Sequence, residues 1–219
     1  MNVFDMIGPV MIGPSSSHTA GAARLGFVAH KVLGQPPIHA HILLSGSFAQ
    51  TYKGHGTDRA ILAGILGLPS HHEGLRDAFR LAEEAGLSFA FEKGDLPDTH
   101  PNTARIRLTG RDGEQCELQG SSIGGGNILI THLDGMEVSF TGQHNTLIVL
   151  HRDKPGTIAA VTGYMADSTL NIGSFRLSRP EKGGVAVMTI EVDDTIPPDI
   201  LTGLNALPNI LRTVLIQAI

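Results

Sequence analysis

The residues whose types and spacing could do chemistry are densest in GPSSSHTAGAARLG, residues 13–26. Three serines run directly into small residues with helical spacing, so Ser15 or Ser16 is predicted to cap a helix. The unpaired N–H groups and the positive dipole end of a helix start favour a carboxylate or a phosphate. Hydroxyl groups would add donors to this predicted anion site, from Ser15, Ser16, Ser17 and Thr19.

His18 lies in the first turn of the same predicted helix. The helix dipole opposes protonation there, so we expect a lowered pKa and a neutral imidazole that can take a proton near pH 7. A serine-rich cap on an ordinary helix explains the spacing equally well. The stretch is therefore a candidate site for anion binding and proton transfer, with that alternative open.

A second dense stretch is TYKGHGTD, residues 51–58. Glycines on both sides of His55 allow a close backbone approach and leave its imidazole clear of neighbouring side chains. Thr57 is predicted to cap the following helix, with Asp58 in its first turn. A glycine-rich turn with an incidental histidine is the alternative interpretation.

Two other pairs of side chains are better explained as structural. His39 and His41 share one face of a predicted strand, but no third ligand lies nearby, so a solvated strand face is favoured over a metal site. Arg105 and Arg107 could fork onto a carboxylate. Cross-strand pairing is the favoured use of the two arginines, with Glu114 or Glu117 as the partner.

Composition limits the classes of function. The chain has 219 residues, a net charge of -5, 5% aromatic residues and no Trp, which disfavours nucleic-acid binding. No apolar run approaches the roughly 20 residues needed to cross a bilayer, and residues 1–14 show no basic leader or cleavage site, so we expect a cytoplasmic protein. Cys116 is the only cysteine, which excludes an internal disulfide and any metal cluster held by several thiolates of this chain.

Periodicity predicts an N-terminal domain with a mixed sheet and helices, over residues 1–143. Helices are expected at residues 19–33, at residues 71–85, and from residue 57 until Gly67 and Pro69 end the helix. Strands are expected at residues 38–44, 87–91, 104–108, 114–119, 128–133 and 136–140. A polar break at 141–145 marks the expected boundary.

From residue 145 to 219 the pattern predicts a second domain in the order βαββαβ. Its strands are expected at 146–150, 170–177, 185–192 and 210–217, with helices at 155–168 and 198–207. This order is the ferredoxin-like split βαβ unit, an antiparallel four-stranded sheet with two helices on one face. Such a module has exposed sheet edges and commonly joins another copy.

The sequences LHRDKPGTI (150–158) and NIGSF (171–175) resemble an ACT domain, the amino-acid-sensing module of metabolic enzymes. The resemblance implies effector contacts at the first turn of the domain, by His151, Asp153, Gly156 and Asn171. The Asp153 carboxylate would suit an ammonium group, whereas some serine-sensing relatives have an amide at this position, so the identity of the effector stays open.

Four motifs in order, GPSSSHTAGAARLG, TYKGHGTDRAILAGILG, HPNTARI and SIGGGNI, resemble the β chain of bacterial iron–sulfur L-serine dehydratase. The resemblance covers the whole length and implies an N-terminal domain similar to the allosteric substrate-binding domain of some phosphoglycerate dehydrogenases. It also implies a partner α chain that holds a [4Fe–4S] cluster and forms the active site together with this chain. The implied reaction removes water from L-serine and yields pyruvate and ammonia, which serves serine catabolism and gluconeogenesis.

The resemblance suggests a role for each candidate residue. An iron of the partner would act on the substrate hydroxyl, while His55, slightly favoured over His18, removes the α-proton. The hydroxyls of Ser15, Ser16, Ser17 and Thr19 would hold the substrate carboxylate, and Lys53 or Asp58 would orient a histidine or the ammonium group.

Two alternatives remain at this point. A regulatory protein that only senses an amino acid would use the same serine-rich stretch and the same ACT domain without catalysing anything. A pyridoxal-phosphate dehydratase would need a Schiff-base lysine, for which Lys53 is the one suitably placed candidate, and this interpretation is the weaker of the two.

Overall fold

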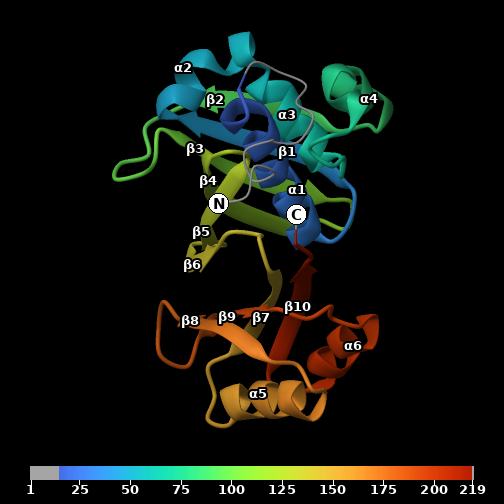
Figure 1. The fold of residues 1–219 in the computed structure, drawn as a ribbon, viewed down its shortest axis with the longest axis vertical. Helices are drawn as coiled ribbons and strands as arrows, with labels where there is room; N and C mark the ends of the chain where they lie inside the picture. The colour runs from blue at the N-terminus through green and yellow to red at the C-terminus, as the bar shows by residue number, and fades with distance from the viewer. Residues whose placement is uncertain (1–14, 219) are drawn as a thin grey trace, which may run out of the picture. The chain divides into compact units, whose positions relative to one another are not determined.

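The computed structural model describes residues 15–218, and the chain divides into two compact units between Asp134 and Gly135 (Figure 1). The predicted absence of a leader concerns residues 1–14, which lie outside the described residues. The predicted domain limits, 1–143 and 145–219, stay a prediction. Both units combine helices with a β-sheet, as the sequence predicts.

The first sheet has the strand order β2-β1-β3-β4-β5-β6. Its strands are β1 (Pro37–Ser45), β2 (Ser88–Lys93), β3 (Asn102–Gly110), β4 (Gln115–Gly124), β5 (Asn127–Leu133) and β6 (Met136–Phe140). β1 runs parallel to β2 and antiparallel to β3, so the sheet is mixed. The two predicted hairpins, β3 with β4 and β5 with β6, are both present.

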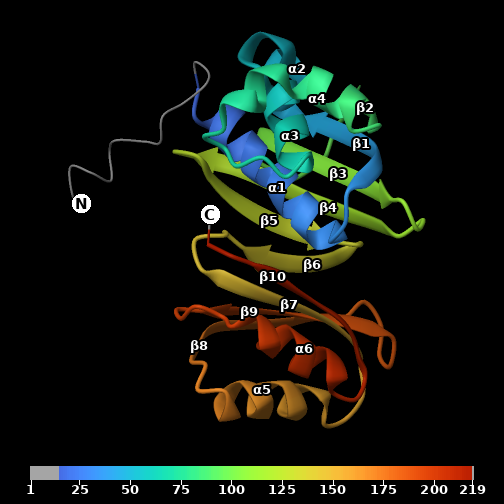
Figure 2. The same ribbon diagram turned by 90° about the vertical axis from the view of Figure 1, so that its right-hand side faces the viewer.

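The helices of this unit lie on one face of the sheet (Figure 2). They are η2 (Ser17–Gly21, a π-helix), α1 (Ala22–Leu33), α2 (Gly46–His55), α3 (Thr57–Ile65), η3 (Glu73–Asp77, a 3-10 helix) and α4 (Ala78–Glu84). Strand side chains facing the helices are fully buried and alternate with more exposed ones, as in Ala104, Ile106 and Leu108 of β3. This alternation fixes the register of the sheet, because a slip of one residue would turn the apolar side chains away from the helices.

α1 and α3 approach each other closely because both carry a glycine at the contact. A Cβ atom on Gly26 would lie 2.2 Å from the carbonyl oxygen of Ile61, and one on Gly64 would lie 2.0 Å from that of Ala23. His30 Nδ1 lies 2.9 Å from the carbonyl oxygen of Ile65 further along. A Cβ atom on Gly67, just after α3, would lie 3.2 Å from Nε2 of the same His30, so the C-terminal ends of α1 and α3 lie together and the two helices run parallel.

Two helical predictions need correction, and one helix was not predicted. The helix expected at 19–33 begins as a π-helix at Ser17, and the helix expected at 71–85 is divided into η3 and α4. The stretch Gly46–His55, to which the sequence pattern assigns no element, is helix α2. The sequence of helix α2 shows no helical periodicity of apolar residues, because only Phe48 and Ala49 of this helix are buried. Tertiary packing of Phe48, which is fully buried, outweighs the low helix propensity of the glycines.

The second unit contains a four-stranded antiparallel sheet with the order β10-β7-β9-β8. Its elements are β7 (Asn145–Arg152), α5 (Thr157–Asp167), β8 (Ile172–Ser178), β9 (Val185–Val192), α6 (Pro198–Ala206) and β10 (Ile210–Ile216). The predicted βαββαβ order is confirmed, and both helices pack on one face over a core that includes Leu147, Val161 and Ile190. Among residues 15–218, no helix combines the length and the hydropathy that a bilayer crossing requires.

Gly26→Ala tests the contact between α1 and α3. The added methyl group has no space, so we expect a loss of about 1–3 kcal/mol of stability and faster hydrogen exchange in both helices. Gly163→Ala in α5 is the matched control, because a Cβ at Gly163 meets nothing within 4 Å. This control should stabilise its helix by about 0.5–1 kcal/mol. Hydrogen exchange read by mass spectrometry separates the two units, and unchanged exchange in α1 and α3 of the Gly26 variant would contradict the close contact.

Candidate active site

His18 is fixed in the π-helix η2, where its side chain contacts two serines. Its Nδ1 lies 3.2 Å from Ser15 Oγ, and its Nε2 lies 3.3 Å from Ser47 Oγ. The residue is 8% exposed, and its ring also packs edge-on against Phe48 at a centroid distance of 5.2 Å. Because a hydroxyl can donate or accept, both tautomers of a neutral imidazole are accommodated here. π-helical turns are often found at functional sites.

His55 meets His18 edge to face, with ring centroids 4.7 Å apart and an interplanar angle of 84°. It is the last residue of α2, and Gly56, with φ +72°, allows the chain to turn directly into α3. A Cβ atom on Gly54 or Gly56 would meet nothing within 4 Å, so no close approach by the described residues requires either glycine. The Nδ1 atom of His55 is buried and has no hydrogen-bond partner among the described residues. The two candidate histidines, far apart in sequence, thus form one pair.

Burial lowers the pKa of His18, and the neighbouring His55 lowers it further. The direction is the predicted one, but the larger causes are burial and a second imidazole rather than the predicted helix dipole. Asp58, 7% exposed, has a raised pKa because of burial, although its Oδ1 accepts a hydrogen bond from the Arg59 backbone N–H at 2.8 Å. Both shifts favour the neutral forms, as expected for a site shielded from water.

The serine cap predicted for the first helix is wrong. Ser16 precedes η2 in a helical conformation, φ -58° and ψ -38°, and makes no side-chain cap, because a capping residue needs extended backbone. The carbonyl oxygen of Ser15 instead accepts from the Thr19 N–H at 3.0 Å and from Thr19 Oγ1 at 2.6 Å. The half-buried hydroxyls of Ser16 and Ser17 lie on the same turn.

Thr57 does not cap α3 either, because the residue before the helix is Gly56 in the left-handed conformation. Thr57 is fully buried, and its Oγ1 has no partner among the described residues. Lys53 is exposed near the end of α2, with its Nζ 5.8 Å from the Tyr52 ring centroid. Asp58 lies in the first turn of α3, as predicted.

Sequence reasoning missed Ser47 and Phe48, which hold the His18 ring from one side. The available signal in the sequence was their position directly after the strand expected at 38–44. Turns that follow the end of a strand commonly carry functional side chains.

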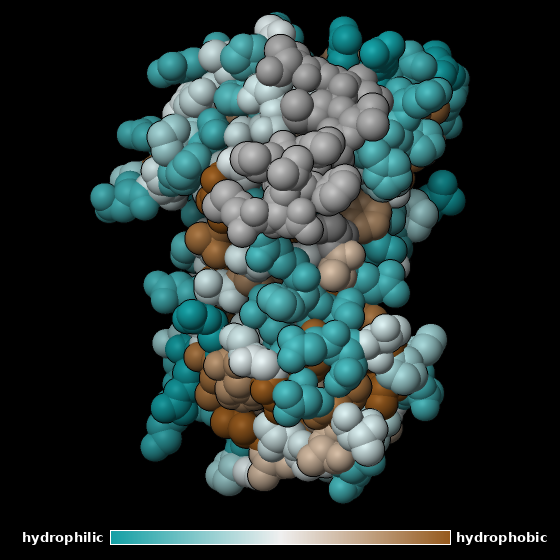
Figure 3. Space-filling view, viewed as in Figure 1, coloured by the Kyte–Doolittle hydropathy of each residue, from teal (hydrophilic) through white to brown (hydrophobic). Residues whose placement is uncertain are grey.

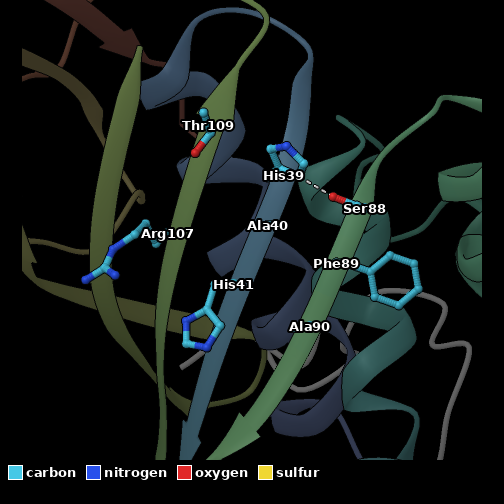
Figure 4. Close-up of a pocket in the computed structure, with 8 residues that line it drawn as sticks. All are labelled: His39, Ala40, His41, Ser88, Phe89, Ala90, Arg107 and Thr109. Carbon is cyan, nitrogen blue, oxygen red and sulfur yellow. Dashed lines mark hydrogen bonds between the residues drawn. The ribbon is translucent and has the colours of Figure 1, made fainter. Parts of the chain in front are cut away.

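The other predicted pairs find partners within the chain. His39 Nδ1 bonds to Ser88 Oγ, and His41 Nε2 lies 2.9 Å from Glu92, beside a shallow cavity of about 280 Å³ on the outer face of β1, β2 and β3 (Figure 4). In residues 15–218 no group of three or more His, Cys, Asp or Glu side chains could hold a metal ion. The favoured interpretation of this pair, a strand face, is the one that the contacts support.

The two arginines face the adjacent strand β4. Arg107 Nη2 lies 2.5 Å from Glu117 Oε2, which confirms one of the two predicted cross-strand partners. Arg105 donates to Gln119 Oε1 from both Nε and Nη2, at 3.0 and 2.8 Å, and its Nε also lies 4.0 Å from Glu117 Oε1. The arginines therefore stabilise the sheet by cross-strand pairs.

The predicted effector residues lie around the turn between β7 and α5. His151 is 1% exposed, with Nδ1 2.9 Å from the Arg152 carbonyl oxygen and a buried Nε2 without a partner among the described residues. Asp153 Oδ2 accepts from the Gly183 N–H at 3.0 Å and from Arg179 Nη1 at 2.6 Å, and these bonds lower the pKa of the carboxyl. Two further predicted contacts are accessible, Gly156 with φ +86° and the exposed Asn171. The effector roles stay predictions.

Comparison with known proteins decides the family. The family model described as serine dehydratase beta chain matches residues 2–82. Over 211 residues the chain is 48% identical to the probable L-serine dehydratase beta chain of Bacillus subtilis, covering 96% of both chains. The chain belongs to the L-serine dehydratase beta-chain family. Within this family, the beta chain of Peptoniphilus asaccharolyticus is 37% identical over 193 residues, 88% of this chain and 87% of that one.

Two further matches agree with the predicted architecture of this family member. The model of an AHAS small subunit-like ACT domain matches residues 147–212, which confirms the ACT-like fold. A D-3-phosphoglycerate dehydrogenase of Methanocaldococcus jannaschii is 28% identical over 191 residues, 86% of this chain but 36% of that enzyme. The predicted resemblance to part of such dehydrogenases is consistent with this match.

His55→Gln tests the electrostatic coupling of the histidine pair. Removing the second imidazole should raise the pKa of His18, while burial, the larger cause, should keep it below the ordinary value of 6.5. The titration of the His18 ring protons by NMR measures both effects. Exposed His71, replaced by Gln, is the matched control and should leave the His18 titration unchanged. A His18 pKa that stays constant or falls in the His55 variant would contradict the coupling.

Proposed function

We propose that this chain works as the β subunit of an L-serine dehydratase that, together with an α chain, converts L-serine into pyruvate and ammonia. The observation that supports this most directly is the contact between His18 and His55, at 4.7 Å, beside three serines at the start of η2. The family membership supplies the substrate and the partner, since the relatives are named L-serine dehydratase beta chain.

In this proposal His55 removes the α-proton of the substrate. Both ring nitrogens of His18 face serine hydroxyls of this chain, whereas His55 Nδ1 has no partner among the described residues. His18 is then a positioning residue that packs against the base and, with its lowered pKa, adds no positive charge beside it. A ring nitrogen that has no partner among the described residues is available to accept the α-proton.

The substrate carboxylate is proposed to bind at the start of η2. Ser16 and Ser17 provide hydroxyl donors there, with Ser15 and Thr19 shaping the same turn through their own hydrogen bonds. Lys53 and Asp58, on either side of His55 in the chain, are proposed to orient a histidine or the ammonium group. Orientation of this kind lowers the barrier by holding the reacting atoms in place.

An iron–sulfur cluster does not fit the described part of this chain. Cys116 is 2% exposed, its Sγ lies 3.7 Å from the Ala29 carbonyl oxygen, and residues 15–218 contain no metal-binding group of three or more ligands. We therefore propose that the [4Fe–4S] cluster belongs to the α chain. We also propose that the complex works in the cytoplasm, where it would serve serine catabolism and gluconeogenesis.

The ACT domain is proposed to bind a small effector at His151, Asp153, Gly156 and Asn171, and to associate with a second copy. β8 is an edge strand of its sheet, and Phe175 and Leu177 on it are 37% and 39% exposed. Apolar surface is visible on the β8 side of this unit (Figure 3). An exposed strand edge with apolar side chains favours association.

The proposal is tested by pyruvate formation from L-serine under anaerobic conditions, with the chain co-expressed with its α chain. His55→Gln should lower kcat by at least about 100-fold, because general-base catalysis contributes that much or more. His18→Gln should lower kcat less, and the exposed control His71→Gln should not change it.

Three outcomes would contradict the proposal. Full activity of this chain without the α chain would exclude a shared active site. Normal kcat/KM in both histidine variants would exclude their catalytic role. A change only in effector response or KM would favour the alternative of a non-catalytic sensing subunit.

A further inference from the structure

Two buried polar atoms at one end of the first sheet have no hydrogen-bond partner among the described residues. They are Oδ1 of Asn102, at the start of β3, and Oγ of Ser122, near the end of β4. Buried polar groups in native proteins are nearly always paired, and an unpaired one lowers stability. An unpaired acceptor that is retained beside a candidate site points to a ligand that pairs with it.

Both side chains face the helices. Along β3, Ala104 and Ile106 are fully buried on the helix-covered face, and strand alternation places Asn102 on that same face. Thr103 pairs with Ser121 in the register of β3 with β4, so Asn102 and Ser122 are opposite each other one step beyond that pair.

The surroundings of the two side chains differ. Ser122 is fully buried under η2, since a Cβ on Gly21 would lie 2.0 Å from its Oγ. Asn102 is partly exposed as a residue, and its backbone bridges to Gly46, directly before the Ser47 that contacts His18 Nε2. Asn102 therefore lies at the edge of the histidine site, whereas η2 covers Ser122.

The chemistry of an amide oxygen selects the group that it would bind. Oδ1 of an asparagine only accepts hydrogen bonds, so it cannot pair with a carboxylate. An amino acid offers an ammonium group with three donors. Asp58 is a less suitable acceptor, because its Oδ1 already accepts from the Arg59 N–H and burial favours its neutral form.

We propose that Asn102 is a substrate-binding residue whose Oδ1 accepts a hydrogen bond from the α-ammonium group of the amino acid. The inference rests on the proposed function, because it takes the histidine site as the place where the amino acid binds. It gives a role to Asn102 of the HPNTARI motif, and it assigns the two charged groups of the substrate to two different parts of the site. The serines of η2 receive the carboxylate, and the sheet end receives the ammonium group.

The test uses Asn102→Leu in the assembled complex and two competitive inhibitors. L-alanine carries the ammonium group without the hydroxyl, and 3-hydroxypropionate carries the hydroxyl without the ammonium group. The variant should bind L-alanine about 10- to 100-fold more weakly, the loss expected for a hydrogen bond to a charged group. Its affinity for 3-hydroxypropionate should not change, and Ser122→Ala, the matched control, should keep wild-type affinity for both.

Two measurements separate this role from a structural one. Asn102→Asp keeps an acceptor oxygen and should bind L-alanine within a few-fold of wild type. The free Asn102→Leu chain should melt no lower than wild type, because the substitution removes an unpaired polar atom. Two results would overturn the inference, provided that the wild-type complex converts L-serine. One is a wild-type affinity of Asn102→Leu for L-alanine, and the other is an equal loss of affinity for both inhibitors. Absence of turnover in the wild-type complex would instead overturn the proposed function.

Discussion

The close contact between α1 and α3 determines where the candidate catalytic groups meet. Gly26 and Gly64 remove the side chains that would separate the helices, and the helices run parallel. The chain just before α1 carries His18, and the chain just before α3 carries His55. Parallel packing brings these two helix starts to the same end, so backbone contact in the helices sets the separation of the imidazoles.

Electrostatic interactions also determine the protonation state of His18. After burial, the His55 imidazole at 4.7 Å is the second cause that lowers the pKa of His18. Hydroxyls rather than carboxylates contact His18, and they satisfy its nitrogens without attracting a proton. The surroundings thus keep His18 neutral.

Much of the fold could be predicted from sequence because several strands, such as β3, alternate between buried and more exposed residues. Ala104, Ile106 and Leu108 define β3, and the order of the last six elements defines the ACT-like unit. Helix α2 could not be predicted, because buried Phe48 stabilises it only through contacts made by the folded chain.

The candidate site, like the fold, could be predicted from the sequence only in part. His18 and His55 could each be selected from local sequence, as a histidine among serines and a histidine between glycines. The contact between the two histidines depends on the parallel packing of α1 and α3, which local residue spacing does not encode. The serine cap failed for a related reason, because the π-helical turn draws Ser15 Oγ to His18.

Gly56 separates two helices that differ greatly in how firmly they are anchored. α3 buries nearly all of its residues, whereas α2, which carries His55, buries Phe48 and Ala49. Local opening begins where few apolar contacts restrain the backbone. On heating, we therefore expect the last turn of α2 to fray while α3 and the sheet persist, so that the His55 imidazole loses its alignment with His18 at temperatures where the unit as a whole is still folded.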